Sequence, residues 1–155
     1  KQKNKGLRLT LGVSTFVPKA HTPFQWHGVE PEAKKRLKIL TKKLKSNGIE
    51  VRAESYGWSL VQALISRSDR RLAPVIDAVR KYPSISLGNW KQAYLLAFKG
   101  ELNANKRELE TQTMPSWNEI IHGSWKHTKT LPWQHLEGPL NKELLIKHEQ
   151  QSFKD

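Results

Sequence analysis

The chain has 155 residues, 37% of them hydrophobic, and a formal net charge of +13 at pH 7. This length suits one domain, or one small domain plus part of another, with a core of modest size. The absence of cysteine excludes disulfides, thiolate zinc sites and iron–sulfur ligation by this chain. No run approaches the ~20 apolar residues of a transmembrane helix. No apolar stretch follows the basic start, so no signal peptide is predicted and a cytoplasmic location is expected. The first residue, Lys1, is not methionine, which favours a fragment or a processed product.

The N-terminal part has the pattern of a strand, a helix and a second strand. Residues 7–17 are apolar and β-branched, which predicts a buried strand. Residues 31–46 are predicted to be a helix that ends at Gly48, a natural left-handed cap. Residues 49–54 alternate between apolar and polar side chains and predict a second strand. A short strand–helix–strand unit of this kind makes the two strands parallel.

The positive charge is concentrated in the same part of the chain. Residues 1–47 hold 12 of the 27 basic residues and only two acidic ones, Glu30 and Glu32. This surface either binds a polyanion or is a solvated face that keeps the protein soluble. The candidates for polyanion contact lie on the predicted helix and are Lys34, Lys35, Lys38, Lys42 and Lys43.

From residue 58 onward the pattern is helical, so the predicted fold class is α/β followed by α. A short helix has Trp58, Val61, Leu64 and Ile65 on its apolar face. Ser68 or Asp69 can cap a second helix, Asn89 a third, and Asn141 a last one that reaches about Phe153. The second helix has Leu72, Val75, Ile76 and Val79 on its apolar face, and the third has Trp90, Ala93, Tyr94 and Ala97. Residues 103–115 are polar, and residues 116–139 have little periodicity.

The loop over residues 18–29 is the leading candidate site, because it follows the first predicted strand. Loops at the carboxyl ends of parallel strands are where α/β folds place binding groups. His21 either contacts a ligand or donates a proton, or else fixes the loop through a hydrogen bond from its ring to the backbone. Gln25 and Trp26 either stack on and hydrogen-bond a planar ligand or pin the loop against the next helix. Glu54 ends the second predicted strand and either faces a substrate or forms a salt bridge with Lys19 or Arg52. The substrate-lining candidates are Lys19, His21, Thr22, Gln25, Trp26, Glu54 and Ser55.

Two further sets of residues, the arginine-rich run at 67–71 and the histidines, are candidates for phosphate and metal binding. The run Arg67-Ser-Asp-Arg-Arg71 either binds phosphate or has Asp69 as a helix cap that pairs with the arginines. The six histidines show no metal-ligand spacing, so no metal site is predicted. No catalytic residue is assigned, because no complete active site can be assembled from these residues.

Four blocks of sequence carry a resemblance to a known family. They are Val13-Ser-Thr-Phe-Val-Pro-Lys-Ala-His-Thr-Pro-Phe-Gln-Trp26, Ser66-Arg-Ser-Asp-Arg-Arg-Leu-Ala-Pro-Val-Ile76, Leu87-Gly-Asn-Trp90, and Leu131-Pro-Trp-Gln-His-Leu136 with Lys142-Glu-Leu-Leu145 behind it. In this order they resemble radical S-adenosylmethionine proteins that carry a cobalamin-binding domain. The first two blocks are the most specific.

The resemblance implies a place for this chain within a larger enzyme. Residues 1–57 would be the last βαβ portion of a partial (β/α) barrel, and residues 58–155 a helical C-terminal extension. The chain would form part of the substrate-site wall and be inactive alone. S-adenosylmethionine, an iron–sulfur cluster and, where it is used, cobalamin would be bound by the full-length protein, with none of them held by this chain alone.

Two other partners follow from the residues themselves. A lone βαβ pair leaves strand edges open, so a second copy of the chain can pair with it to form a homodimer if the remainder of the polypeptide does not. The alternative function, from a different class, is a basic non-enzymatic module that binds RNA or another polyanion through the helix at 31–46. No membrane association is predicted.

Overall fold

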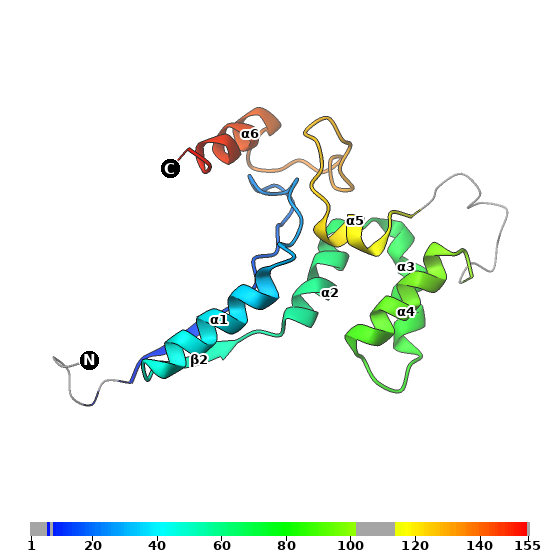
Figure 1. Ribbon diagram of the computed structural model, residues 1–155. Coiled ribbons are helices and arrows are strands. Elements are labelled where there is room, and N and C mark those ends of the chain that lie inside the picture. Colours follow the sequence, from blue (N-terminus) through cyan, green and yellow to red (C-terminus); the bar gives the residue numbers. More distant parts are fainter. Residues whose placement is uncertain (1–5, 7, 102–113, 155) are drawn as a thin grey trace.

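The computed structural model describes residues 6, 8–101 and 114–154. Most of the polar stretch predicted over 103–115 therefore lies outside the described residues. The chain is mixed α/β, with one two-stranded parallel sheet near its start and helices over most of the rest (Figure 1).

The predicted βαβ unit is present. Strand β1 (Thr10–Val13) is followed by helix α1 (Ala33–Ser46) and strand β2 (Glu50–Ala53). The strands are parallel, with Thr10 opposite Glu50 and Val13 opposite Ala53. Gly48 has a φ of 69°, so the predicted left-handed cap between α1 and β2 is confirmed.

The prediction that residues 7–17 form a buried strand is wrong in both length and burial. The strand covers only four residues, and Leu9 and Leu11 are 53% and 42% exposed. A strand of a parallel sheet is buried when further strands and helices cover both of its faces. Here β1 has one neighbouring strand, and α1, which packs against β2, has no buried residue.

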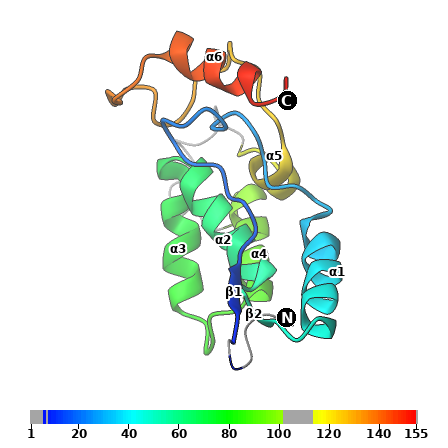
Figure 2. The same ribbon diagram turned by 90° about the vertical axis from the view of Figure 1, so that its left-hand side faces the viewer.

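The rest of the chain forms short helices, shown in two views in Figures 1 and 2. The strand pair and α1 lie on one side of a body made by α2–α5, and α6 lies across the end where the loop after β1 runs. The elements are α2 (Tyr56–Arg67), the 3-10 turn η1 (Arg70–Leu72), α3 (Ala73–Arg80), α4 (Leu87–Phe98), α5 (Trp117–His122) and α6 (Lys142–Gln151).

Capping residues explain where several of these helices begin. The side chains of Asp69 and Asn141 accept hydrogen bonds from Arg71 N and Leu144 N, as their predicted capping roles require. Helix α4 begins one turn earlier than expected, because Ser86 and not Asn89 is its cap. Helix α5 was not predicted at all.

The predicted apolar faces hold in part. Every residue predicted on the buried side of α4 is buried, as are Val61 and Leu64 of α2. Trp58 and Ile65 of α2, at 50% exposure each, and Ile76 of α3, at 47%, face solvent instead. The buried side of α2 is shifted toward Ser59, Leu60, Ala63 and Arg67.

Two clusters of buried side chains hold the body together. The larger one joins α2, α3, α4 and α5 and also takes in Val17 and Val29 from the loop after β1. The smaller one consists of Trp26, Leu131, Trp133 and Leu145. Both clusters therefore include residues of the loop at 17–29, which ties it to the helical body.

Within residues 6, 8–101 and 114–154, no helix combines the length and apolar character that crossing a bilayer needs.

Candidate functional site

The loop after β1 combines internal hydrogen bonds with several buried residues. Thr22 Oγ1 donates to the carbonyl of Lys19 at 2.7 Å. His21 is the one non-glycine residue with a positive φ, 56°, in the part of the chain that is described. Its ring lies against Gly138, where an added Cβ would come within 2.4 Å of His21 Nδ1. The backbone N of His21 donates to Gln25 Oε1 at 3.1 Å, whereas the expected hydrogen bond from the His21 ring to the backbone is not recorded among the described residues.

Gln25 and Trp26 face the interior of this chain. Trp26 is 1% exposed and belongs to the smaller cluster, while Gln25 is 5% exposed. Trp133 Nε1 donates to Gln25 Oε1 at 2.7 Å. Both residues therefore have a packing role, but against Leu131, Trp133 and Leu145 and not against the next helix, α1, as the packing alternative supposed. A substrate-lining role for the loop stays a prediction.

Glu54 and Ser55 lie apart from that loop, where β2 leads into α2. The backbone N of Glu54 donates to Val13 O at 2.9 Å, and both side chains are exposed. The expected salt bridge of Glu54 is not recorded within the described residues: Arg52 pairs with Glu50 at 3.0 Å, and Lys19 forms no ion pair there. No hydrogen bond or ion pair within the described residues joins Glu54 or Ser55 to residues 18–26.

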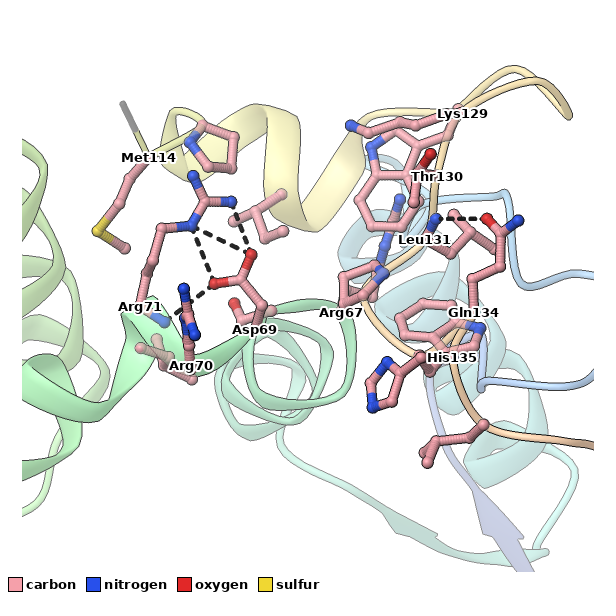
Figure 3. A pocket seen from close by; sticks show the side chains of 18 of the residues that line it. Arg67, Asp69, Arg70, Arg71, Met114, Lys129, Thr130, Leu131, Gln134 and His135 are labelled. Atoms are coloured by element: carbon pink, nitrogen blue, oxygen red, sulfur yellow. Dashed lines mark hydrogen bonds and ion pairs between the residues drawn. The ribbon is translucent and has the colours of Figure 1, made fainter. Parts of the chain in front are cut away.

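An open cavity of about 1030 Å³ lies between the end of α2 and the segment after α5. Its wall is formed by residues 67–72, Tyr94, residues 114–115, Ile120, Trp125 and residues 129–136. Figure 3 shows Asp69, Arg70 and Arg71 on one side of it, Lys129, Thr130 and Gln134 on the other, and Arg67 between them. The family-like blocks at 66–76 and 131–136 thus meet across one cavity.

Arg67 is a buried cation without a carboxylate partner. It is 1% exposed, and its Nη1 and Nη2 donate to the carbonyls of Ile121 and Gly123 at 3.2 and 2.6 Å. Nε is buried without a hydrogen-bond partner. Among the described residues no acidic side chain pairs with this guanidinium, and desolvation lowers its pKa to about 10.

The Trp125 ring lies close to two cations. The guanidinium carbon of Arg67 is 4.0 Å from the ring centre, and Lys129 Nζ is 4.4 Å from it. Desolvation, and then the neighbouring charge of Arg67, lower the pKa of Lys129. The aromatic face offers both cations a favourable quadrupole, but it does not neutralise either charge.

Asp69, which supplies the carboxylate of the cavity wall, already has a partner within the chain. Asp69 accepts from the backbone N of Arg71 at 2.9 Å and forms an ion pair with its Nη2 at 2.7 Å. The hydrogen bonds from Arg71 lower the pKa of Asp69. Of the two roles left open for residues 67–71, the capping and pairing role of Asp69 is therefore present. Asp69 forms an ion pair with Arg71 but not with Arg67 or Arg70, although the charge of Arg70 also helps to lower the pKa of Asp69.

The five candidate lysines of α1 are all exposed to solvent. Lys35 lies 3.5 Å from Glu32 across an exposed pair, and no ion pair is recorded for the other four within the described residues. Lys34, Lys38 and Lys42 follow one another at four-residue intervals, so they share one side of the helix. This arrangement fits both a solvated face and a polyanion-binding face.

Sequence reasoning missed Lys129, Trp125 and the role of Arg67. For Trp125 and Lys129, the only indication in the sequence was that an aromatic and a basic residue lie four positions apart in a segment without periodicity. Nothing local in the sequence pointed Arg67 toward Ile121 and Gly123, which lie more than 50 residues away. Across the described part of the chain, no three His, Asp or Glu side chains are grouped as a metal site requires.

Comparison with known proteins gives one curated relative. The uncharacterized protein MJ0966 of Methanocaldococcus jannaschii is 29% identical to this chain over 96 residues. The match covers 62% of this chain and 21% of the relative, so the chain spans about a fifth of the relative's length. No protein-family model matches the chain, and no solved structure matches it. The relative is thus much longer than the segment it shares with this chain.

Proposed function

We propose that this chain is the C-terminal portion of a radical S-adenosylmethionine enzyme of the family with a cobalamin-binding domain. It would complete the enzyme's partial barrel, form part of the substrate-site wall and have no activity alone. The four sequence blocks suggest the family. The observation that carries the proposal is the uncovered parallel strand pair, β1 and β2.

The state of the strand pair supports a position inside a larger sheet. Parallel strands occur in sheets whose two faces are covered, and two strands alone are marginal in water. Leu9 and Leu11 are nevertheless 53% and 42% exposed, and both outer edges of the pair are unpaired within the described residues. The remainder of the same polypeptide is the partner that we propose for these edges. A second copy of the chain is the other candidate.

The two faces of the strand pair differ in a way that suits a barrel wall. Val13 and Val51 share one face with Leu11 and are half-buried. Thr10, Glu50 and Arg52 lie on the other face, all exposed, with Glu50 accepting from Thr10 at 3.2 Å and from Arg52 at 3.0 Å. In a barrel covered outside by helices such as α1, this polar face would point inward, toward a ligand.

The cofactors would be held elsewhere. A radical S-adenosylmethionine cluster needs cysteine thiolates, and this chain has none, so its residues do not fit the group. S-adenosylmethionine binding and its reductive cleavage would therefore belong to another part of the protein. Methyl transfer is the proposed reaction type where cobalamin is used, and the substrate is unassigned. A cytoplasmic location for the full-length protein is part of the same proposal.

The test uses the full-length protein that contains this chain. Its upstream sequence should contain a Cys-x-x-x-Cys-x-x-Cys motif. After anaerobic reconstitution it should bind a cluster and release 5′-deoxyadenosine from S-adenosylmethionine. Arg52→Ala should reduce turnover at least tenfold while leaving the melting temperature unchanged. Arg80→Ala is the matched control, because Arg80 is also an exposed arginine paired with an acid, Asp77 at 2.6 Å.

Two results would refute the proposal. One is a full-length protein without the three-cysteine motif. The other is a cluster-loaded enzyme in which Arg52→Ala and Arg80→Ala have equal activity, which would remove the strand pair from the substrate-site wall.

A second function rests on α1. None of its residues is buried, and its five candidate lysines all face solvent. This favours a basic module that binds RNA or another polyanion through electrostatic contacts. Polyanion binding by this chain, together with a full-length protein that lacks the three-cysteine motif, would favour this second function over the enzyme.

A further inference from the structure

The cavity between α2 and the segment at 129–136 has an excess of positive charge. Four of its lining residues are cationic, namely Arg67, Arg70, Arg71 and Lys129, and the lining has a single carboxylate, that of Asp69. Because Asp69 pairs with Arg71, its charge is largely used within that pair. The remaining three cations form no ion pair with an acidic side chain among the described residues, although the charge of Asp69 also acts on Arg70 and that of Glu119 on Lys129.

The burial of Arg67 makes this excess unusual. A guanidinium that is 1% exposed is ordinarily paired with a carboxylate, because an uncompensated buried charge is costly. Here the protein supplies only two carbonyl oxygens and the Trp125 face, and it leaves Nε without a partner. The positive potential therefore persists at the cavity wall.

Two further cations can reach into the cavity from its opposite sides. Arg70 and Lys129 are both exposed and both line it, and Figure 3 shows Arg70 on the side of Asp69 and Lys129 on the other side. Lys129 lies near Arg67, whose charge disfavours its protonated form. An anion placed between Arg70 and Lys129 would relieve this repulsion and gain charge-assisted hydrogen bonds.

We propose that this cavity is a binding site for a small ligand that carries a phosphate or carboxylate group. Arg70 and Lys129 contact the anionic group, and Arg67 acts from behind the wall as a fixed positive charge. Trp125 holds Arg67 and Lys129 in place and supplies an apolar surface beside the group. Thr130 and Gln134 line the same side as Lys129 and can donate further hydrogen bonds. This proposal uses only the cavity of this chain and does not depend on the enzyme family.

The test is isothermal titration calorimetry on the 155-residue chain at about 50 mM salt, with inorganic pyrophosphate and citrate as separate probes. We expect saturable binding of one equivalent. Lys129→Ala and Arg70→Ala should each weaken binding at least tenfold. Both residues are exposed, so circular dichroism should confirm an unchanged fold. The matched control is Lys99→Ala/Lys147→Ala, which removes two exposed cations that lie outside both the cavity lining and α1 and should change the affinity by less than about threefold.

The outcomes separate the ligand sources. Binding of pyrophosphate alone assigns the site to a phosphate, binding of citrate alone assigns it to a carboxylate, and binding of both supports a general oxyanion site. The proposal is overturned if neither probe binds below about 5 mM. It is also overturned if Lys99→Ala/Lys147→Ala lowers the affinity as much as Lys129→Ala and Arg70→Ala do, because the binding would then reflect net charge alone.

Discussion

Trp133 Nε1 donates a 2.7 Å hydrogen bond to Oε1 of Gln25, and the same oxygen accepts from the backbone N of His21 at 3.1 Å. One buried side-chain oxygen thus joins the loop after β1 to a segment 108 residues further along the chain. The bond from Trp133 therefore links the residue before Trp26 to another member of the smaller cluster.

Gln25→Ala should destabilise the chain by roughly 1–3 kcal/mol, because it leaves the buried indole N–H and a backbone N–H without an acceptor. Urea unfolding monitored by circular dichroism measures the loss. Gln62→Ala removes an exposed glutamine from α2 and should change the free energy of unfolding by less than about 0.5 kcal/mol. Equal stability of the two variants would mean that the contact to Trp133 contributes little.

Gly28→Ala should be strongly destabilising, by roughly 2–3 kcal/mol, because an added Cβ would lie 2.3 Å from the carbonyl carbon of His122. The backbones of residues 28–29 and 121–122 are held together there by a 2.8 Å bond from Val29 N to Ile121 O. At Gly12 the same addition would meet nothing within 4 Å. Thermal unfolding should therefore show a large drop for Gly28→Ala and almost none for Gly12→Ala.

Glu149→Ala should release α6 from the loop after β1. The Glu149 carboxylate is 6% exposed and contacts two imidazoles, with His27 at one oxygen and His127 Nε2 at 2.6 Å from the other. Loss of both contacts should cost roughly 2–3 kcal/mol and accelerate amide exchange in α6. His148→Ala, which removes an exposed neighbour on the same helix, should leave the exchange of α6 unchanged.

Tyr94 should make the chain sensitive to alkali. Burial raises the pKa of Tyr94 to about 12, and its hydroxyl donates to the carbonyl of Pro115 at 2.8 Å. The folded state therefore holds the phenolic proton more tightly than the unfolded state. The resulting stability, roughly 2–3 kcal/mol, is fully present below pH 10 and is lost as the pH rises toward about 12.

The contribution of Tyr94 can be isolated by comparing the chain with Tyr94→Phe from pH 9 to 12. The stability difference between the two proteins should shrink across this interval. Arg67, whose pKa is lowered to about 10, titrates there in both proteins and cancels in the difference. A difference that stays constant with pH would show that Tyr94 ionises as readily in the folded state as in the unfolded one.

Polyanion binding through α1 should be purely electrostatic. Lys38→Ala/Lys42→Ala should reduce the slope of log affinity for single-stranded RNA against log salt by about 1.4. Lys126→Ala/Lys147→Ala removes two exposed lysines outside α1 and should leave the slope nearly unchanged. Binding that persists at high salt and selects particular sequences would contradict this picture.

Local signals in the sequence predicted the secondary structure where capping groups and turns are encoded nearby. Gly48, Asp69 and Asn141 mark real element ends, because each acts on backbone within three residues. Helix α5 escaped prediction because it has only six residues, although its capping box, Ser116 with Glu119, is visible in the sequence.

The site was less predictable, because its contacts are long-range. The neighbourhood of Asp69 suggested that it would pair with all nearby arginines, yet Arg67 points away from it, to carbonyls at Ile121 and Gly123. The burial of Trp26 depends on Leu131, Trp133 and Leu145, whose positions no local pattern reveals. Features set by residues close together in the sequence could therefore be predicted, whereas contacts between distant residues could not.

The smaller cluster also has a consequence for the order of folding. Contacts among α2, α3 and α4 join segments close in sequence and can form early, at low cost in chain entropy. Trp26 meets Leu131 and Trp133 only after a loop of about 100 residues has closed. Refolding should therefore end with a slow phase in which the C-terminal segment docks on the loop after β1. Gln25→Ala should mainly speed unfolding and leave the earlier phase unaltered.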